Sequence, residues 1–205
     1  MAKGHLFVIS APSGAGKTSL VKAIMQDASH IQASISYTTR PMREGEVNGK
    51  DYHFIKKDTF IKMQNADDFL EYAEVFGNFY GTSKSWLTDT LAKGDDVILE
   101  IDWQGAEQVR KSFSDSTGIF IVPPSRSILL ERLKGRGTDS DEVIERRTAE
   151  AIIEMSHYPE FDYLVINDDF DTALQEIQSI IQSFRLKTSR QYEKQPQIFD
   201  DLVAP

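Results

Sequence analysis

The sequence predicts an α/β protein in which a parallel β-sheet is flanked by helices. Three short apolar runs, at 6–9, 97–102 and 119–122, have the composition of buried parallel strands. A glycine-containing turn follows the first run and leads into an amphipathic helix at 18–27. Strand, turn and helix in this order form the first unit of an α/β fold, and 205 residues suffice for one globular unit with a substantial core.

Composition and charge narrow the class of protein. Forty per cent of the residues are hydrophobic and 27% are charged, and there is no cysteine for disulfides or thiolate metal sites. The net charge of −9 argues against a general affinity for nucleic acid, so we expect no nucleic-acid partner. No stretch approaches the ~20 apolar residues of a membrane helix, so we expect no membrane partner and a cytoplasmic location.

The rest of the chain divides into regions of different character. Short β candidates separated by polar loops predict a small mixed α/β insert, and an arginine-rich helical region interrupted at 135–137 predicts a helical lid. A last strand is expected at 163–166 and a last helix at 172–187, before a polar tail after Ser189 that we expect to be loosely held. We therefore divide the chain into a discontinuous core at 1–35, 86–128 and 151–205, an insert at 36–85 and a lid at 129–150.

The turn after the first strand carries the sharpest motif. From residue 11 it reads A-P-S-G-A-G-K-T, against the phosphate-loop (P-loop) template G-x-x-x-x-G-K-[ST], and departs from it only at Ala11. Backbone N–H groups of such a loop, with the positive end of the following helix, bind phosphate oxygens. Lys17 would reach the β- and γ-phosphates of a nucleotide, and Thr18 would offer its hydroxyl to Mg²⁺. The expected phosphate-binding residues are Ala11, Pro12, Ser13, Gly14, Ala15, Gly16, Lys17 and Thr18.

A second candidate phosphate site lies in the insert. Arg40 and Arg43 are three residues apart, close enough to hold one phosphate, and their guanidinium groups match phosphate geometry. The base-reading motif N-K-x-D of GTPases does not occur in the sequence. The chain therefore has two candidate phosphate sites without the signature of a GTPase.

An ordered set of motifs resembles guanylate kinase. It begins with T-T-R-x-x-R-x-G-E-x-x-G-x-D-Y-x-F at 38–54 and continues with F-L-E-Y-A, G-N-F-Y-G-T, E-I-D-W-Q-G and G-R-G-T. The resemblance runs from about residue 5 to about residue 185, and the family accepts alanine at the position of Ala11. It implies a P-loop NTPase core with a five-stranded parallel sheet, a GMP-binding insert and a mobile helical lid. It also implies transfer of the γ-phosphoryl group of ATP to GMP, and to dGMP, with Mg²⁺ as cofactor.

The resemblance assigns residues to the GMP site. A carboxylate accepts both the N1–H and the 2-amino group of guanine, which matches Glu71, and a site built on such bonds rejects the wrong base. Asp102 is left with two interpretations, a Mg²⁺ contact through water or a position on the guanine side. Glu100 stands where many relatives carry aspartate, and both acids are open to a simple helix-capping role. The implied GMP-binding residues are Ser36, Arg40, Arg43, Tyr52, Glu71, Tyr80, Thr82, Glu100 and Asp102.

The lid and the last strand complete the expected site. The resemblance implies Lys17, Arg136 and Arg147 as catalytic residues, with Arg132 and Asn167 on the ATP side. The nucleophile would be an ionised phosphate, with a second pKa of about 6, so no general base is needed and the four histidines are expected to be structural or exposed. The alternatives are a non-catalytic guanylate-kinase-like binding module and a kinase for another nucleoside monophosphate. Homo-oligomerisation is left open.

Overall fold

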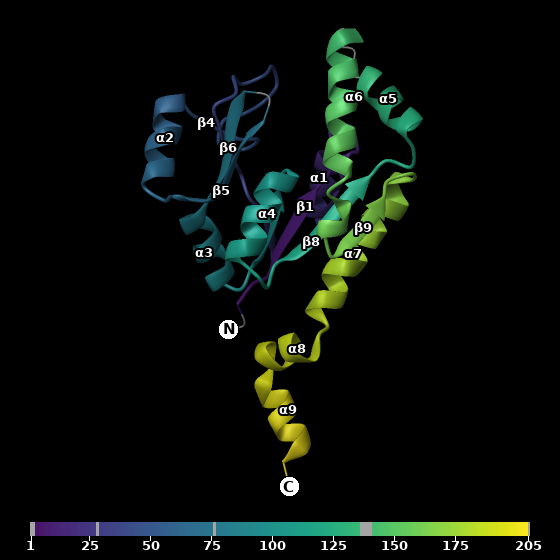
Figure 1. The fold of residues 1–205 in the computed structure, drawn as a ribbon. Helices are drawn as coiled ribbons and strands as arrows, with labels where there is room; N and C mark the ends of the chain where they lie inside the picture. Colours follow the sequence, from purple (N-terminus) through teal and green to yellow (C-terminus); the bar gives the residue numbers. More distant parts are fainter. Residues whose placement is uncertain (1–2, 28, 76, 136–140, 205) are drawn as a thin grey trace.

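A computed structural model describes residues 3–27, 29–75, 77–135 and 141–204 (Figure 1). Within these residues the core is a five-stranded parallel sheet, as predicted, in the order β2-β7-β1-β8-β9. The apolar runs expected to be strands all lie in it. Its strands are β1 (Leu6–Ser10), β2 (Ile31–Ala33), β7 (Asp96–Glu100), β8 (Thr117–Val122) and β9 (Tyr163–Ile166).

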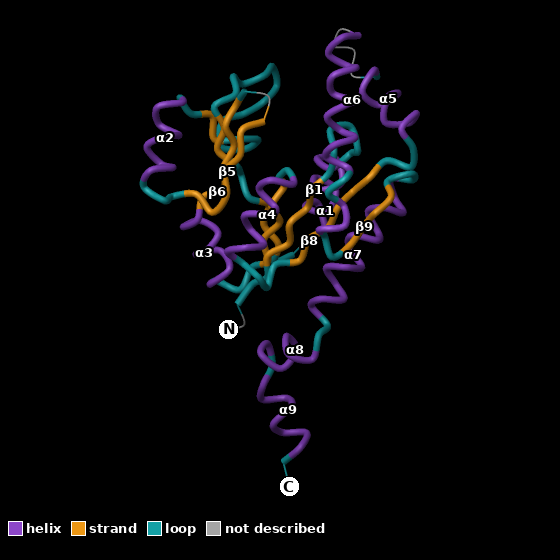
Figure 2. Tube along the Cα trace, in the orientation of Figure 1, coloured by secondary structure: helices purple, strands orange, loops and turns teal. Residues whose placement is uncertain are grey.

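Helices surround and connect these strands (Figure 2). None of the helices in the described ranges is long and apolar enough to cross a membrane. Outside the insert the helices are α1 (Lys17–Asp27), α3 (Lys84–Ala92), α4 (Trp103–Ser112), α5 (Arg126–Lys134), α6 (Asp141–Met155), the short 3₁₀ helix η1 (Tyr158–Glu160), α7 (Phe170–Arg185), α8 (Thr188–Lys194) and α9 (Pro196–Val203).

The central strand β1 shows how the sheet is covered on both faces. All of its residues are buried, and successive side chains of a strand point to opposite faces. Phe7 and Ile9 pack in one apolar cluster with residues of α1 and α7. Leu6 and Val8 pack in another cluster with residues of α3 and α4. The continuous apolar run at 6–9 is thus explained by burial on both sides.

The insert is a separate small sheet with one helix on it. Its strand order is β4-β3-β6-β5, with β3 parallel to β4 and antiparallel to β6, as a mixed insert requires. Phe60 stacks on Phe69 at 4.5 Å between ring centroids and joins the helix to the sheet. The strand β4 is short, because the side chains of Asn48 and Asp51 accept hydrogen bonds from backbone N–H groups and hold the preceding segment in a loop. The elements are β3 (Tyr37–Thr38), β4 (His53–Phe54), α2 (Lys57–Asn65), β5 (Phe69–Val75) and β6 (Asn78–Ser83).

The insert and the predicted lid segment lie on opposite sides of the core. The insert and the α5–α6 pair stand on either side of α1 and α4 in Figure 1. Leu129 and Leu133 of α5 pack against Ala151 of α6, so the predicted lid segment forms a helical pair. The tail after Ser189, predicted to be loosely held, is helical and extends beyond the core as α8 and α9.

Candidate active site

The P-loop joins β1 to α1 in a backbone conformation that two glycines make possible. Gly14 and Gly16 have φ values of 91° and 94°, in the left-handed region that other residues avoid. Asn167, at the end of β9, donates from Nδ2 to the carbonyl oxygen of Ala15 at 2.7 Å. A Cβ on Gly16 would lie 2.4 Å from this Nδ2 atom. The expected ATP-side residue Asn167 therefore holds the loop from the sheet side, a contact that requires glycine at position 16.

The first residues of α1 contact the end of β7. Lys17 Nζ donates to the carbonyl oxygen of Ile101 at 3.0 Å, and the Thr18 hydroxyl donates to the Glu100 carboxylate. The strand ends at Glu100, so the expectation that Asp102 ends the strand is wrong. Asp102 is instead the N-cap of α4, where its Oδ1 accepts from Gly105 N–H at 2.9 Å. Its carboxylate is held by the helix start because the N–H groups there have no partner within the helix.

Of the expected lid arginines, one contacts the P-loop and another contacts Asn167, which itself bonds the loop. Arg147 Nη2 donates to Ser13 Oγ at 2.6 Å, and Arg132 Nη2 donates to the carbonyl oxygen of Asn167 at 2.9 Å. Arg132 also keeps a buried Nη1 atom without a hydrogen-bond partner in the described part of the chain. The third expected lid residue, Arg136, lies outside the described residues.

An acidic residue of α6, the helix that carries Arg147, also contacts the P-loop. Glu154 Oε2 accepts from the backbone N–H of Ser13 at 3.1 Å. Burial raises the pKa of the Glu154 carboxyl, and the bond from Ser13 and the charge of Lys17 partly oppose this rise. A carboxylate therefore accepts a hydrogen bond from one of the N–H groups of the loop.

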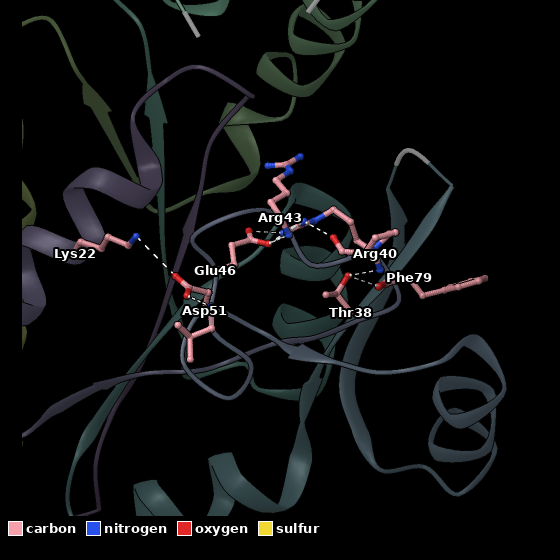
Figure 3. Close-up of polar contacts among 9 residues, drawn as sticks. Lys22, Thr38, Arg40, Arg43, Glu46, Asp51 and Phe79 are labelled. Atoms are coloured by element: carbon pink, nitrogen blue, oxygen red, sulfur yellow. Dashed lines mark hydrogen bonds and ion pairs between the residues drawn. The ribbon is translucent and has the colours of Figure 1, made fainter. Parts of the chain in front are cut away.

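The paired arginines of the insert are arranged differently from each other (Figure 3). Arg40 forms a two-point ion pair with Glu46, at 2.6 and 3.0 Å, which is the main reason that the pKa of Arg40 is raised and that of Glu46 lowered. The Arg43 backbone N–H also donates to Glu46, at 2.7 Å, whereas its guanidinium points away from that carboxylate. Glu46 thus organises the turn that carries both arginines.

Both expected tyrosines lie beside Arg40. The Arg40 guanidinium lies 5.4 Å from the ring centre of Tyr52, and the rings of Tyr52 and Tyr80 are 6.0 Å apart. Burial, followed by the charge of Glu100, raises the pKa of the Tyr52 hydroxyl to about 12, so it remains a proton donor at neutral pH. An ion pair of 4.0 Å at the surface joins Lys22 of α1 to Asp51, the insert residue that precedes Tyr52 (Figure 3).

Glu71 is a buried carboxylate on β5. Its side chain is 3% exposed, and burial raises its pKa to about 7, with Thr82 opposing the rise and Asp102 adding to it. Glu71 and Thr82 are paired across β5 and β6. The Thr82 hydroxyl approaches Glu71 without hydrogen-bond geometry, and it is buried with no partner in the described ranges. Buried polar groups of this kind mark a binding site, because they normally have partners. Ser36 lies just before β3, where its carbonyl oxygen accepts from His53 N–H at 2.9 Å.

The insert and the core meet at this carboxylate. A Cβ on Gly105 of α4 would lie 2.5 Å from Glu71 Oε2, and the charges of Asp102 and Lys17 both act on the pKa of Glu71. The structure therefore brings together the P-loop, the start of α4 and the insert.

The contacts of two acidic residues in this region were not predicted from the sequence. Glu46 lies inside the motif T-T-R-x-x-R-x-G-E, six residues after Arg40, so its spacing contained a usable signal. Glu154 lies in a charged helix 141 residues from its partner Ser13, and no local pattern indicates that contact.

A parallel sheet with a P-loop at the end of its first strand, and an insert with paired arginines beside it, defines a P-loop nucleotide-binding protein. Comparison with known proteins specifies the family. The guanylate kinase family model matches residues 3–184. The chain is 59% identical over 191 residues to the guanylate kinase of Hahella chejuensis, covering 93% of this chain and 92% of that protein. It is 52% identical to the guanylate kinase of Escherichia coli K12 over the full length of both.

A solved structure agrees with this assignment. The crystal structure of guanylate kinase from Anaplasma phagocytophilum matches with a TM-score of 0.76 and 34% identity, over 92% of this chain and 90% of that one. The chain belongs to the guanylate kinase family.

Proposed function

We propose that this protein transfers the γ-phosphoryl group of ATP to GMP, and to dGMP, giving ADP and the corresponding diphosphate. The observation that carries this proposal is the buried Glu71 carboxylate of the insert, which is packed against Gly105 of α4 and whose pKa is affected by the charge of Lys17 in the P-loop. A base recognised by Glu71 would have its phosphate directed toward Arg40 and Arg43 on one side and the P-loop on the other.

The ATP side of the proposal rests on the loop at 11–18. Its N–H groups would bind the phosphates, with Lys17 reaching the transferred group. Arg132, whose buried Nη1 has no partner among the described residues, and Asn167, which holds the loop, would line the same side. The full set is Ala11, Pro12, Ser13, Gly14, Ala15, Gly16, Lys17, Thr18, Arg132 and Asn167.

The GMP side rests on the insert. Glu71 would accept hydrogen bonds from guanine N1–H and the 2-amino group, and the buried Thr82 hydroxyl and Ser36 would reach the other polar edge of the base. Adenine presents an acceptor at N1, which would face the carboxylate, so its binding would leave buried polar groups unpaired. The phosphate would contact Arg40, Arg43, Tyr52 and Tyr80.

The transfer itself needs placement and positive charge rather than a general base. The attacking group is a phosphate oxygen that is already ionised near neutral pH, because its second pKa is about 6. Lys17 and Arg147, together with Arg136, would face the oxygens on which charge accumulates. Closure of insert and lid would exclude water and so limit hydrolysis of ATP.

Oxygen donors at the end of β7 fit a magnesium ion that enters with ATP. Thr18 and Glu100 are in contact, and hydroxyl and carboxylate oxygens are ligands that Mg²⁺ prefers. Bound there, Mg²⁺ would neutralise charge on the phosphates. Asp102 is engaged as a helix cap, so its part would be an indirect one through water.

The proposal includes the division of the chain into a core at 1–35, 86–128 and 151–205, an insert at 36–85 and a lid at 129–150. It also places the protein in the cytoplasm, where its small nucleotide substrates are found.

A coupled assay that offers ATP with GMP, dGMP, AMP, CMP and UMP separately tests the proposal. We expect turnover with GMP and dGMP and at least about a hundredfold lower kcat/KM with the other three, because sites built on hydrogen bonds reject mismatched analogues by up to roughly 10⁴ to 10⁵. Equal use of AMP would contradict the base assignment. No turnover together with tight peptide binding would support a scaffold module instead.

A further inference from the structure

One side chain of the core covers the outer edge of the insert sheet. β5 is the last strand of that sheet, so backbone groups that face away from β6 have no neighbouring strand. At Tyr72 both groups are nevertheless bonded. The Tyr72 N–H donates to Gln108 Oε1 at 3.2 Å, and Gln108 Nε2 donates to the Tyr72 carbonyl oxygen at 2.7 Å. The carboxamide thus pairs with the edge of β5 as a neighbouring strand would.

Gln108 lies on the face of α4 that contacts Glu71. Gly105 lies three residues before Gln108, so both are on one side of the helix. The Glu71 carboxylate is packed against Gly105, and Tyr72 is the next residue of β5. One face of α4 therefore holds two consecutive residues of β5, the first by its side chain and the second by its backbone.

The start of α4 is in turn tied to the P-loop. Lys17 Nζ bonds the carbonyl oxygen of Ile101, and Asp102 caps the helix one residue later. A continuous set of contacts thus leads from the P-loop through α4 and Gln108 to the backbone of β5. Two hydrogen bonds to one residue fix both the distance and the register of a strand, and a register shift by one residue would turn Glu71 to the other face.

We propose that Gln108 is a positioning residue for guanine recognition. By pairing with the Tyr72 backbone it fixes β5 on α4, and so sets the place of the Glu71 carboxylate relative to the P-loop. This inference rests on the proposed function of Glu71. Gln108 acts through the backbone of β5 in the insert, so its effect falls on the nucleotide bound by the insert and not on the one bound by the P-loop.

The test compares Gln108→Met with Glu107→Gln. Methionine has similar length and no hydrogen-bonding amide, whereas Glu107 is the neighbouring exposed residue, paired with Lys111 on its own helix. We expect Gln108→Met to raise the KM for GMP about tenfold, the scale of one or two net hydrogen bonds, with the KM for ATP changed less than twofold. The preference for GMP over AMP should fall by a similar factor. Glu107→Gln should match the unmodified protein.

Amide hydrogen exchange supplies a readout that does not depend on turnover. The Tyr72 N–H should exchange faster in Gln108→Met and not in Glu107→Gln. A folded Gln108→Met protein with an unchanged KM for GMP would overturn the inference, as would equal rises in KM for both nucleotides. If that variant does not fold, Gln108→Glu takes its place, because it keeps the hydrogen-bond acceptor and loses the donor. An unchanged KM for GMP, or equal rises in KM for both nucleotides, would overturn the inference in that variant too. Lack of GMP turnover by the unmodified protein would count against the proposed function alone. Exchange of the Tyr72 N–H would still test whether Gln108 fixes the backbone of β5.

Discussion

The carboxylate of Glu71 is packed against the backbone of Gly105, so closely that a Cβ at Gly105 would lie 2.5 Å from Glu71 Oε2. This contact joins a strand of the insert to a helix of the core. It also makes the position of the carboxylate that we propose to recognise the base depend on a residue with no side chain of its own.

Gly105→Ala is expected to weaken GMP binding although it favours the helix. Alanine stabilises a helix interior by about 1 kcal/mol over glycine, but here its methyl group would displace the Glu71 carboxylate. We expect the KM for GMP to rise at least about tenfold, since misplacing a polar contact costs roughly one hydrogen bond to a charged group. Steady-state kinetics with each nucleotide varied will measure it, and Lys111→Ala on the exposed face of α4 is the control. An unchanged KM for GMP would show that the site tolerates the shift.

The raised pKa of Glu71 predicts a pH dependence of GMP binding. Burial raises this pKa from 4.5 to about 7, and only the ionised carboxylate can accept from both guanine donors. GMP affinity should therefore increase as the pH rises from 6 to 8. The GMP phosphate also titrates near pH 6, so the same titration of Glu71→Gln isolates the carboxylate. A variant with the same pH profile and the same affinity would remove Glu71 from the site.

Glu71 also predicts a pH dependence of stability. Because its folded pKa is the higher one, its contribution is fully present below about pH 4.5 and is lost as the pH rises through about 7. The unmodified protein should thus lose stability relative to Glu71→Gln between pH 5 and pH 8, by up to the order of 3 kcal/mol. Urea unfolding at the two pH values measures this difference. A gain in stability relative to Glu71→Gln with rising pH would mean that the Glu71 carboxylate is not desolvated.

Glu46→Gln is expected to impair GMP binding through Arg40. The ion pair orients the Arg40 guanidinium, and Glu46 also holds the Arg43 backbone, so its loss would let the turn that carries both arginines move. We expect the KM for GMP to rise about tenfold and that for ATP to stay constant, given that hydrogen bonds between charged groups are worth more than neutral ones. Glu44→Gln, an exposed neighbour, is the matched control. A lower KM for GMP would indicate that Glu46 competes with the phosphate.

Glu154→Gln is expected to strengthen ATP binding. The carboxylate accepts from Ser13 N–H in the loop that would hold phosphates, so ATP meets a like charge there. Glutamine keeps the acceptor and removes the charge, and we expect the KM for ATP to fall roughly threefold to tenfold. Glu145→Gln, exposed on the same helix, should change nothing. A rise in the KM for ATP would mean that the carboxylate organises the loop for the nucleotide.

Local chemistry decided which parts of this structure the sequence could predict. The P-loop and β9 were predicted because a glycine pattern or an apolar run in a short segment specifies each of them. The end of β7 was misplaced at Asp102 because an acid at a strand end and an acid at a helix N-cap look the same when two residues separate the elements, and a helix-capping role for Asp102 was among the interpretations left open. The contacts Ser13–Glu154 and Tyr72–Gln108 join distant segments, and only the fold brings them together.

The most direct test of the account follows labelled phosphate from ATP. The protein is incubated with ATP labelled at the γ-position and with GMP, and the products are separated, with Lys17→Met as the control. We expect the label to appear in GDP, and Lys17→Met, while still folded and binding GMP, to lose at least about a hundredfold in rate, as for removal of one transition-state contact. Label found only in inorganic phosphate, or a Lys17→Met protein of nearly full activity, would contradict direct transfer between the two phosphate sites.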